Sequence, residues 1–140
     1  MKMKNTRGYV SNLSREVREN CNFRKVLYTS ENMQLVIMDI DLNEDIGEEI
    51  HESLDQCIRV ESGEGKAVLD GEECYIEKGF MVVVPAGTKH NIINTSNTFS
   101  LKLYTIYSPP EHQDGTIHPT KKDAESNNKH FNGIITGSLK

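Results

Sequence analysis

The residues most able to do chemistry lie between Gly79 and Asn94, in a stretch that reads GFMVVVPAGTKHNIIN. Pro85 ends the ladder of the apolar strand before it, because proline has no N–H to donate. Gly87 lets the chain turn back without a Cβ clash. The side-chain period of a strand is two, so His90 and Asn94 then point to one side. An imidazole in such a position can bind a metal ion or move a proton.

This stretch is similar to the second motif of the cupin family, whose five characteristic positions match at Gly79, Pro85, Gly87, His90 and Asn94. The resemblance extends over roughly residues 20–125, and it points to small single-domain bacterial cupins named mannose-6-phosphate-isomerase-like proteins. It implies an all-β fold, a double-stranded β-helix or jelly-roll barrel with a pocket at one mouth. It implies no single activity, because this fold hosts enzymes, binding modules and storage proteins.

The first cupin motif falls upstream, in altered form, on Asn43, Glu49, His51, Gln56 and Gly63. The spacing holds, but only His51 and Gly63 match the motif by residue type. Asn43 replaces a glycine, which is a mild change because asparagine tolerates a positive φ. Glu49 replaces the first histidine and Gln56 replaces the glutamate, so one carboxylate remains but at a different position.

The resemblance therefore implies a metal site formed by Glu49, His51, Gln56 and His90. Two imidazoles and one carboxylate suit a divalent Zn, Fe, Mn or Ni ion, whereas an amide oxygen is a weak, neutral ligand. We expect metal binding to be weaker or less selective than in a cupin with three histidines. Glu49, His51 and His90 are also the candidate catalytic residues, and Glu49 can act as a general base where it does not bind the metal.

Each of these residues also has a purely structural interpretation. His51 and His90 can be hydrogen-bonded barrel histidines, Gln56 can line the pocket, and Glu49 can belong to a solvated acidic strand end. Glu49 and His51 are two residues apart, so their side chains lie on one face of a strand, and this favours the interpretation as a site. Weaker candidates for ligand contact are Tyr104, Tyr107, Lys89 and Lys102. For Lys102 a position on the outer face of its strand is the favoured interpretation, and for Lys89 a charge in a loop.

Two classes of function follow from this set. The first is a metal-dependent enzyme, either a sugar-phosphate isomerase of the mannose-6-phosphate type or a metal-dependent dioxygenase. The second is a non-catalytic cupin that binds a small molecule or a sugar. A phosphosugar needs cationic partners, and the motif strands offer few: Arg59 faces outward by parity, and Arg24 is remote in sequence.

The elements that must position these residues are short strands, which favour a barrel over a parallel α/β sheet. Apolar or alternating runs occupy Met33–Ile40, Gln56–Glu61, Phe80–Val84 and Thr98–Tyr107. The run Phe80–Val84 is continuously apolar, so we expect it to be buried. Asp70-Gly71 between two further runs is typical of a type I′ hairpin turn.

We expect three parts: an N-terminal arm with a short helix over residues 1–22, the cupin barrel over 23–108, and a polar lid or tail over 109–140. Ser11 or Ser14 can cap the helix, with Leu13 and Val17 on one face. Two histidines, His112 and His118, lie in the last part. A solvated tail is the favoured interpretation there, and a lid over the pocket is the alternative.

Composition limits the class of protein and its partners. The chain has 140 residues, a net charge of −5 and 36% apolar residues, which suit one domain. An acidic chain is poorly suited to bind nucleic acid, whose phosphate backbone is negatively charged. No apolar run approaches the ~20 residues that cross a membrane. The three cysteines lack the close spacing of a disulfide framework or a zinc site.

The remaining expectations concern location and assembly. The N-terminus has no apolar segment of the kind found in signal peptides, so a cytoplasmic location follows by default. Small cupins pair strands across a dimer, and the resemblance therefore implies a homodimer that binds a small-molecule ligand. The edge near Phe23–Tyr28 and the turn Leu13–Val17 are the segments available for that pairing.

Overall fold

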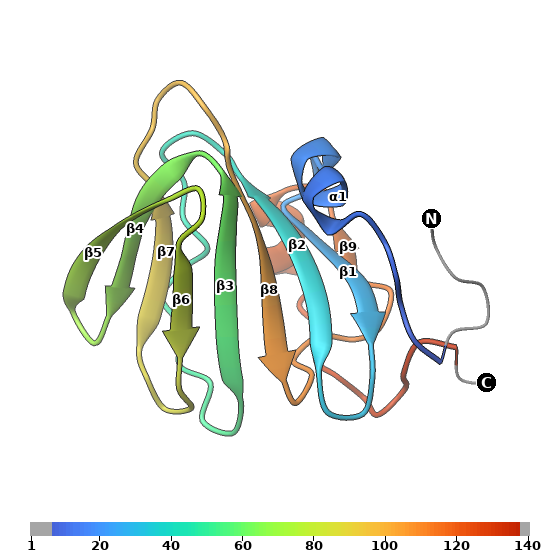
Figure 1. Ribbon diagram of the computed structural model, residues 1–140. Coiled ribbons are helices and arrows are strands. Elements are labelled where there is room, and N and C mark those ends of the chain that lie inside the picture. Colours follow the sequence, from blue (N-terminus) through green and yellow to red (C-terminus); the bar gives the residue numbers. More distant parts are fainter. Residues whose placement is uncertain (1–6, 138–140) are drawn as a thin grey trace.

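The computed structural model describes residues 7–137. Within them the chain forms two short helices and nine strands, in the order α1 (Leu13–Glu19), β1 (Arg24–Thr29), β2 (Gln34–Ile40), β3 (Asp55–Ser62), β4 (Glu64–Leu69), β5 (Glu72–Glu77), β6 (Met81–Val84), β7 (His90–Asn94), β8 (Leu101–Ser108), β9 (Ile117–His118) and α2 (Lys121–Ser126). Figure 1 shows that strands dominate the molecule.

The strands form two antiparallel sheets. The larger sheet has the order β6-β3-β8-β2-β1-β9 and the smaller one has the order β5-β4-β7 (Figure 1). Alternate residues of each strand point inward, as in β8, where Leu101, Leu103, Thr105 and Tyr107 are buried. The apolar inward residues of both sheets make one core, which includes Val36, Met38, Ile40, Ile58, Val60, Ala67, Ile76 and Ile92. This architecture confirms the expected all-β jelly-roll fold.

Two turns follow directly from local sequence. Asp70 and Gly71 have φ values of 49° and 85°, and they join β4 to β5 with Leu69 paired to Glu72. Two positive φ values in a row are the mark of a type I′ turn, so the hairpin prediction is confirmed.

Asn43 also has a positive φ, of 58°, as its replacement of a glycine predicts. Gly63 is required by a close approach, because a Cβ there would lie 2.4 Å from the carbonyl oxygen of Ser100.

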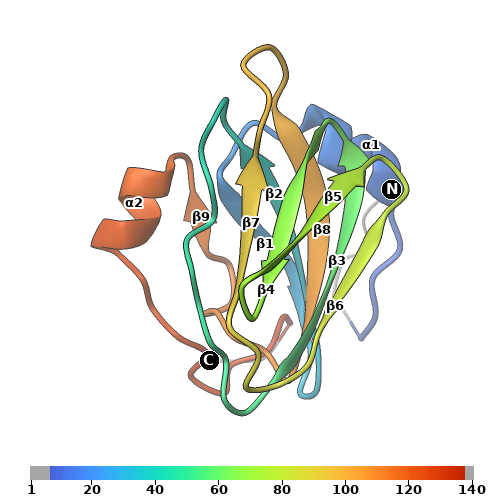
Figure 2. The ribbon, with the colours of Figure 1, turned by 90° about the vertical axis from the view of Figure 1, so that its left-hand side faces the viewer.

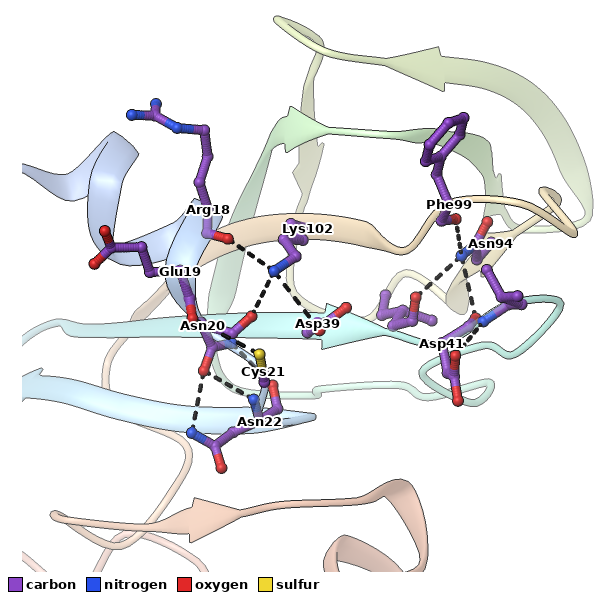
Figure 3. A network of polar contacts seen from close by, with 12 residues as sticks. Arg18, Glu19, Asn20, Cys21, Asn22, Asp39, Asp41, Asn94, Phe99 and Lys102 are labelled. Carbon is purple, nitrogen blue, oxygen red and sulfur yellow. Dashed lines mark hydrogen bonds and ion pairs between the residues drawn. The ribbon is translucent and has the colours of Figure 1, made fainter.

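The helix α1 covers the outer face of the larger sheet. It begins after Asn12, whose side chain accepts a hydrogen bond from the Arg15 N–H, so the cap is Asn12 and neither Ser11 nor Ser14. Val17, a residue of this helix, is fully buried. Lys102 projects from the outer face of β8, as predicted, and its Nζ donates to the carbonyl oxygens of Arg18 and Asn20, both at 2.8 Å. Figure 3 shows this lysine closing the end of the helix.

The strand β6 differs from expectation. The run Phe80–Val84 was predicted to be buried, yet Met81 is 48% exposed and Val83 is 62% exposed. Their neighbours Val82 and Val84 point into the core. The physical reason is that β6 forms one edge of the larger sheet and has packing partners on its inner side only.

The segment after Ser108 packs against the barrel. Its strand β9 pairs with β1, with Arg24 opposite His118, and α2 follows (Figure 2). His112 and His118 are each only 3% exposed, so the favoured interpretation of a solvated tail was wrong for these histidines. The buried side chain of Gln34 explains part of this: its Nε2 donates to the His112 carbonyl oxygen at 2.7 Å, and its Oε1 accepts from the His112 N–H at 3.0 Å. The division into three parts at residues 22 and 108 stays a prediction.

The helices of the described part are short. The longer one, α1, has 7 residues. No helix in residues 7–137 has the length and apolar character needed to cross a membrane.

Asn94, the last residue of the second motif, is a testable anchor of the fold. Its buried Nδ2 lies within hydrogen-bonding distance of the carbonyl oxygens of Ile40, Asp41 and Phe99, at 3.0, 3.1 and 3.1 Å (Figure 3). We expect Asn94→Ala to lower the free energy of unfolding by about 2 kcal/mol or more, because buried carbonyl groups lose their donors. Urea denaturation measures this change.

The matched control is Asn97→Ala in the exposed loop that follows β7. It should change the free energy of unfolding by less than about 0.5 kcal/mol, as most exposed substitutions do. Equal effects of the two substitutions would contradict the anchoring role of Asn94.

Candidate functional site

The two motifs meet along the strand β7. Residues 41–54 contain no long strand, but they run beside β7 through isolated bridges that pair Asp45 with Ile93 and Glu49 with His90. Figure 2 shows this segment next to β7, on the side that faces β9 and α2. The N–H of Gly87 also donates to the His51 carbonyl oxygen at 2.8 Å. The glycine-containing turn therefore holds the upstream motif in place.

Glu49, His51 and His90 come together at this point. Glu49 and His90 exchange two backbone hydrogen bonds, each 2.9 Å long. The ring centroids of His51 and His90 are 5.3 Å apart, and His51 Nε2 lies 3.7 Å from Glu49 Oε2. The side chain of His51 is 9% exposed and that of Glu49 is 36% exposed. The carboxylate thus lies at the rim and the two imidazoles lie deeper.

His90 has a fixed orientation. Its Nδ1 lies 2.9 Å from the carbonyl oxygen of Thr88, and because a carbonyl can only accept, Nδ1 carries the proton when the ring is neutral. The other ring nitrogen, Nε2, is then left with its lone pair. Histidines that bind metal ions commonly have one nitrogen held by a carbonyl in this way.

Gln56 lies on the inner face of β3 and is 5% exposed. Its Nε2 donates to Thr105 Oγ1 at 2.9 Å, and Thr105 Oγ1 donates to the Cys57 carbonyl oxygen at 3.0 Å. These bonds fix the amide so that Oε1 is its free end. Gln56 is paired across the sheet with Tyr107, whose ring stands edge-on to that of His51 at 5.9 Å between centroids. Tyr107 therefore links the two residues, since it is the strand partner of Gln56 and the ring neighbour of His51.

Two buried polar atoms of this group have no hydrogen-bond partner in the described part of the chain, namely His51 Nε2 and Gln56 Oε1. Buried polar atoms in native proteins are seldom left without a partner. Both atoms are Lewis bases when the imidazole nitrogen is unprotonated, so the donor chemistry fits a divalent cation. In residues 7–137, however, no three His, Cys, Asp or Glu side chains converge closely enough to form a metal cluster. The set is therefore not arranged as a closed cage.

One further residue of the site, Glu111, was not found from the sequence. Glu111 Oε2 lies 3.8 Å from His51 Nδ1 and 3.3 Å from His130 Nδ1, so the C-terminal segment supplies a second carboxylate beside His51. Glu111 is mostly buried, whereas His130 is 68% exposed. The one available signal was the gathering of polar and histidine residues after Ser108, which gives no position relative to the barrel.

Tyr107 and His112 extend the site beneath the C-terminal segment. The Tyr107 hydroxyl lies 3.3 Å from His112 Nε2, and the two rings meet edge-on. Burial raises the pKa of Tyr107 above its usual value, so the phenol keeps its proton. Burial, with the nearby charge of Arg24 as the next cause, lowers the pKa of His112 well below its usual 6.5. The His112 ring is therefore neutral at pH 7.

Comparison with known proteins gives consistent results. The family model described as "Cupin domain" matches residues 36–107. The uncharacterized protein YrkC of Bacillus subtilis is 43% identical over 122 residues, which make up 83% of this chain and 65% of that protein. The uncharacterized protein L612 of Acanthamoeba polyphaga mimivirus is 46% identical over 112 residues, or 78% of this chain and 70% of that protein. The chain thus spans about two thirds of the length of these relatives.

A solved structure agrees over more of the chain. The crystal structure of BH2720 from Bacillus halodurans has a TM-score of 0.85 and 38% sequence identity, and the match covers 91% of this chain and 100% of that one. The agreement includes most of the segment after Ser108, because a match of this extent leaves few residues outside it.

The buried His112 predicts a specific pH dependence of stability. Its pKa is lower in the folded chain than in the unfolded chain, so below about pH 6.5 the unfolded state binds a proton that the folded state does not. Its contribution is complete above that pH and is lost as the pH falls toward the folded pKa. We expect His112→Gln to remove about 1 kcal/mol of the acid destabilisation per pH unit below 6.5.

Urea denaturation at about pH 7.5 and about pH 5.5 measures the difference in stability between the two conditions. Gln113→Ala, the neighbouring substitution, should keep the wild-type difference. If His112→Gln keeps it as well, the burial of a neutral imidazole is not what makes the fold sensitive to acid.

Proposed function

The chain belongs to the cupin family, and on that premise we propose that it binds a divalent metal ion through Glu49, His51, Gln56 and His90. The observation that carries this proposal is the pair of buried atoms without hydrogen-bond partners in the described residues, His51 Nε2 and Gln56 Oε1. The fixed proton of His90 supports it, because it leaves Nε2 of that ring free to bind.

The proposed site is weaker than a cage of three imidazoles and one buried carboxylate. The amide of Gln56 carries no net charge, and the Glu49 carboxylate lies at the rim with a 36% exposed side chain. A solvated carboxylate gains less from binding a cation than a buried one does, because water already screens its charge. We therefore propose a dissociable metal ion, whose affinity depends on Glu49 and the two histidines together.

The residues around the proposed metal ion have separate roles in binding and in proton transfer. A divalent ion, when bound, polarises a carbonyl group or orients a diol of the ligand. Glu49, at the rim, can accept a proton from a ligand carbon or hydroxyl group where it does not bind the metal ion. The carboxylates of Glu49 and Glu111 lie 3.7 and 3.8 Å from opposite ring nitrogens of His51, so negative charge stands on both sides of that ring. The buried ring of Tyr107 packs edge-on against His51 and excludes water from that side.

This arrangement supports a reaction of the isomerase type, in which one group removes a proton and returns it to a neighbouring carbon. The shortage of cations that argued against a phosphosugar is partly removed, because Arg24 is buried in the cavity that Glu49 also lines. A metal-dependent dioxygenase would use the same ligands. The second candidate is a non-catalytic module that binds a small molecule or sugar, and the open arrangement of the donors favours it.

Metal content tests the proposal directly. We expect protein purified without a metal-chelating tag to contain, or to take up on titration, about one divalent ion per chain. Glu49→Ala and His90→Ala should each weaken binding by about tenfold or more, as loss of a direct ligand does. Elemental analysis and calorimetric titration measure this.

The matched control is Glu48→Ala, which removes a neighbouring exposed carboxylate that lies 3.5 Å from Lys89. It should keep the wild-type affinity. Protein that contains no metal and binds none of the four candidate ions on titration would remove the metal proposal and leave the non-catalytic module.

We also propose that the chain forms a homodimer. The edge expected to mediate it is partly covered, because β9 pairs with Arg24 and Lys25 of β1. The opposite edge of the same sheet, β6, has no strand beside it in the described residues. Light scattering at tens of micromolar should give twice the mass of one chain, and a monomer there would contradict the dimer.

A further inference from the structure

A second cluster of buried polar groups lies beside the proposed metal site. Arg24 is 5% exposed and His118 is 3% exposed, although both can carry charge. One terminal nitrogen of the guanidinium lies 3.4 Å from His118 Nδ1, and its central carbon is 5.3 Å from the centroid of the Phe23 ring. The ion pairs found in residues 7–137 do not include Arg24. A buried guanidinium without a carboxylate partner is unusual, because burial of an unpaired charge is strongly unfavourable.

Two nitrogen atoms of this cluster lack a partner in the described residues, Arg24 Nε and His112 Nδ1. The guanidinium Nε always carries a proton, so it is a donor. The neutral His112 ring has one proton, and its Nε2 lies next to the Tyr107 hydroxyl. When that hydroxyl donates to Nε2, the ring proton sits on Nδ1 and makes it a second donor without an acceptor.

Arg24 and His112 both line a cavity of about 110 Å³. Pockets that enclose a whole small-molecule ligand are about 300 Å³ or more, so this cavity has room for one functional group of a ligand. Glu49 forms part of its wall, and Ala124 of the helix α2 forms another part. The cavity therefore adjoins the proposed metal site through a shared side chain.

The other charges around the cavity favour an acceptor at Arg24. Lys121 lines the cavity but is paired with Asp45. Glu49 faces His51, and Glu125 is exposed on α2. These two carboxylates stand at the rim and can accept hydrogen bonds from hydroxyl groups. The buried charge of the cavity is that of Arg24, which an oxyanion would neutralise.

We propose that this cavity binds the oxyanion group, a carboxylate or a phosphate, of a small hydroxylated ligand, with Arg24 Nε and His112 Nδ1 as donors. The rest of the ligand extends past Glu49 toward His51 and His90. The oxyanion site depends on Arg24 and His112 alone, whereas the position of the rest of the ligand rests on the proposed function.

The test uses the full chain, stripped of metal with a chelator, and two probes, inorganic phosphate and acetate. Sodium chloride keeps the ionic strength constant. We expect at least one probe to bind saturably in calorimetry and to raise the Tm. The tighter probe distinguishes a phosphate site from a carboxylate site. Arg24→Gln should weaken binding by about tenfold or more, because it removes a charge-assisted hydrogen bond.

The matched control is Arg15→Gln, the same change in a side chain that is 67% exposed on α1, and it should leave binding unchanged. Asn128 is an exposed residue at the cavity rim and serves where Arg24→Gln does not fold. We expect Asn128→Glu to weaken anion binding and Asn128→Lys to strengthen it, each by severalfold, because charge at the rim acts on an anion inside.

The inference is overturned if neither probe binds at tens of millimolar, or if Arg24→Gln or the two Asn128 variants bind the anion as the wild type does. Its failure is distinct from failure of the proposed function. Anion binding is measured without metal, and metal binding is measured through Glu49→Ala and His90→Ala. Either result can hold without the other.

Discussion

The two backbone hydrogen bonds between Glu49 and His90 are the constraint on which the site depends. They attach an otherwise irregular segment, residues 41–54, to the edge of the smaller sheet at β7. Together with the hydrogen bond from the Gly87 N–H to the His51 carbonyl oxygen, they fix Glu49 and His51 relative to His90. The Asn94 side chain anchors the other end of the same strand, because its Nδ2 lies within hydrogen-bonding distance of the carbonyl oxygens of Ile40 and Asp41, at the start of that segment, and of Phe99 in the loop after β7. The family motif residues of β7 thus serve the architecture and the chemistry together.

A second constraint is the burial of polar groups between the barrel and the C-terminal segment. The Gln34 side chain forms hydrogen bonds with the backbone of His112, and the pairing of β9 with β1 places His118 opposite Arg24. Most of these groups find partners, as burial requires. Six buried side-chain atoms of the described residues have no partner, and four of them belong to the two proposed sites: His51 Nε2 and Gln56 Oε1 in one, Arg24 Nε and His112 Nδ1 in the other. The remaining two are Asp39 Oδ1 in β2 and Arg59 Nε in β3. The four atoms at the proposed sites are the observation on which both binding proposals rest.

The replacements in the first motif change the character of the pocket. Moving the one carboxylate of the usual set from the Gln56 position to the Glu49 position shifts negative charge from the interior to the rim. The interior then holds a neutral amide, two imidazoles and a protonated phenol, with the buried guanidinium of Arg24 and the mostly buried carboxylate of Glu111 nearby. A neutral amide at the Gln56 position repels an anionic ligand less than a glutamate there would, because like charges repel strongly where water is excluded.

The sequence alone determined the features that depend on neighbouring residues. These include the type I′ turn at Asp70-Gly71, the positive φ of Asn43, the inward set of β7 and the outward position of Lys102. It also brought Glu49, His51 and His90 together through motif spacing. Each is encoded locally, in the φ preference of a residue or in the period of two along a strand.

Only the tertiary structure decided which side of β6 meets solvent, that Glu111 reaches His51, and that Arg24, His112 and His118 are buried together. Arg24 and His118 are separated by 94 positions along the chain. Their contact follows from the pairing of β9 with β1, and a pairing of two residues leaves no periodic signal in the sequence. Burial of a charged residue is set by what packs over it, and in this protein that cover comes from the opposite end of the chain.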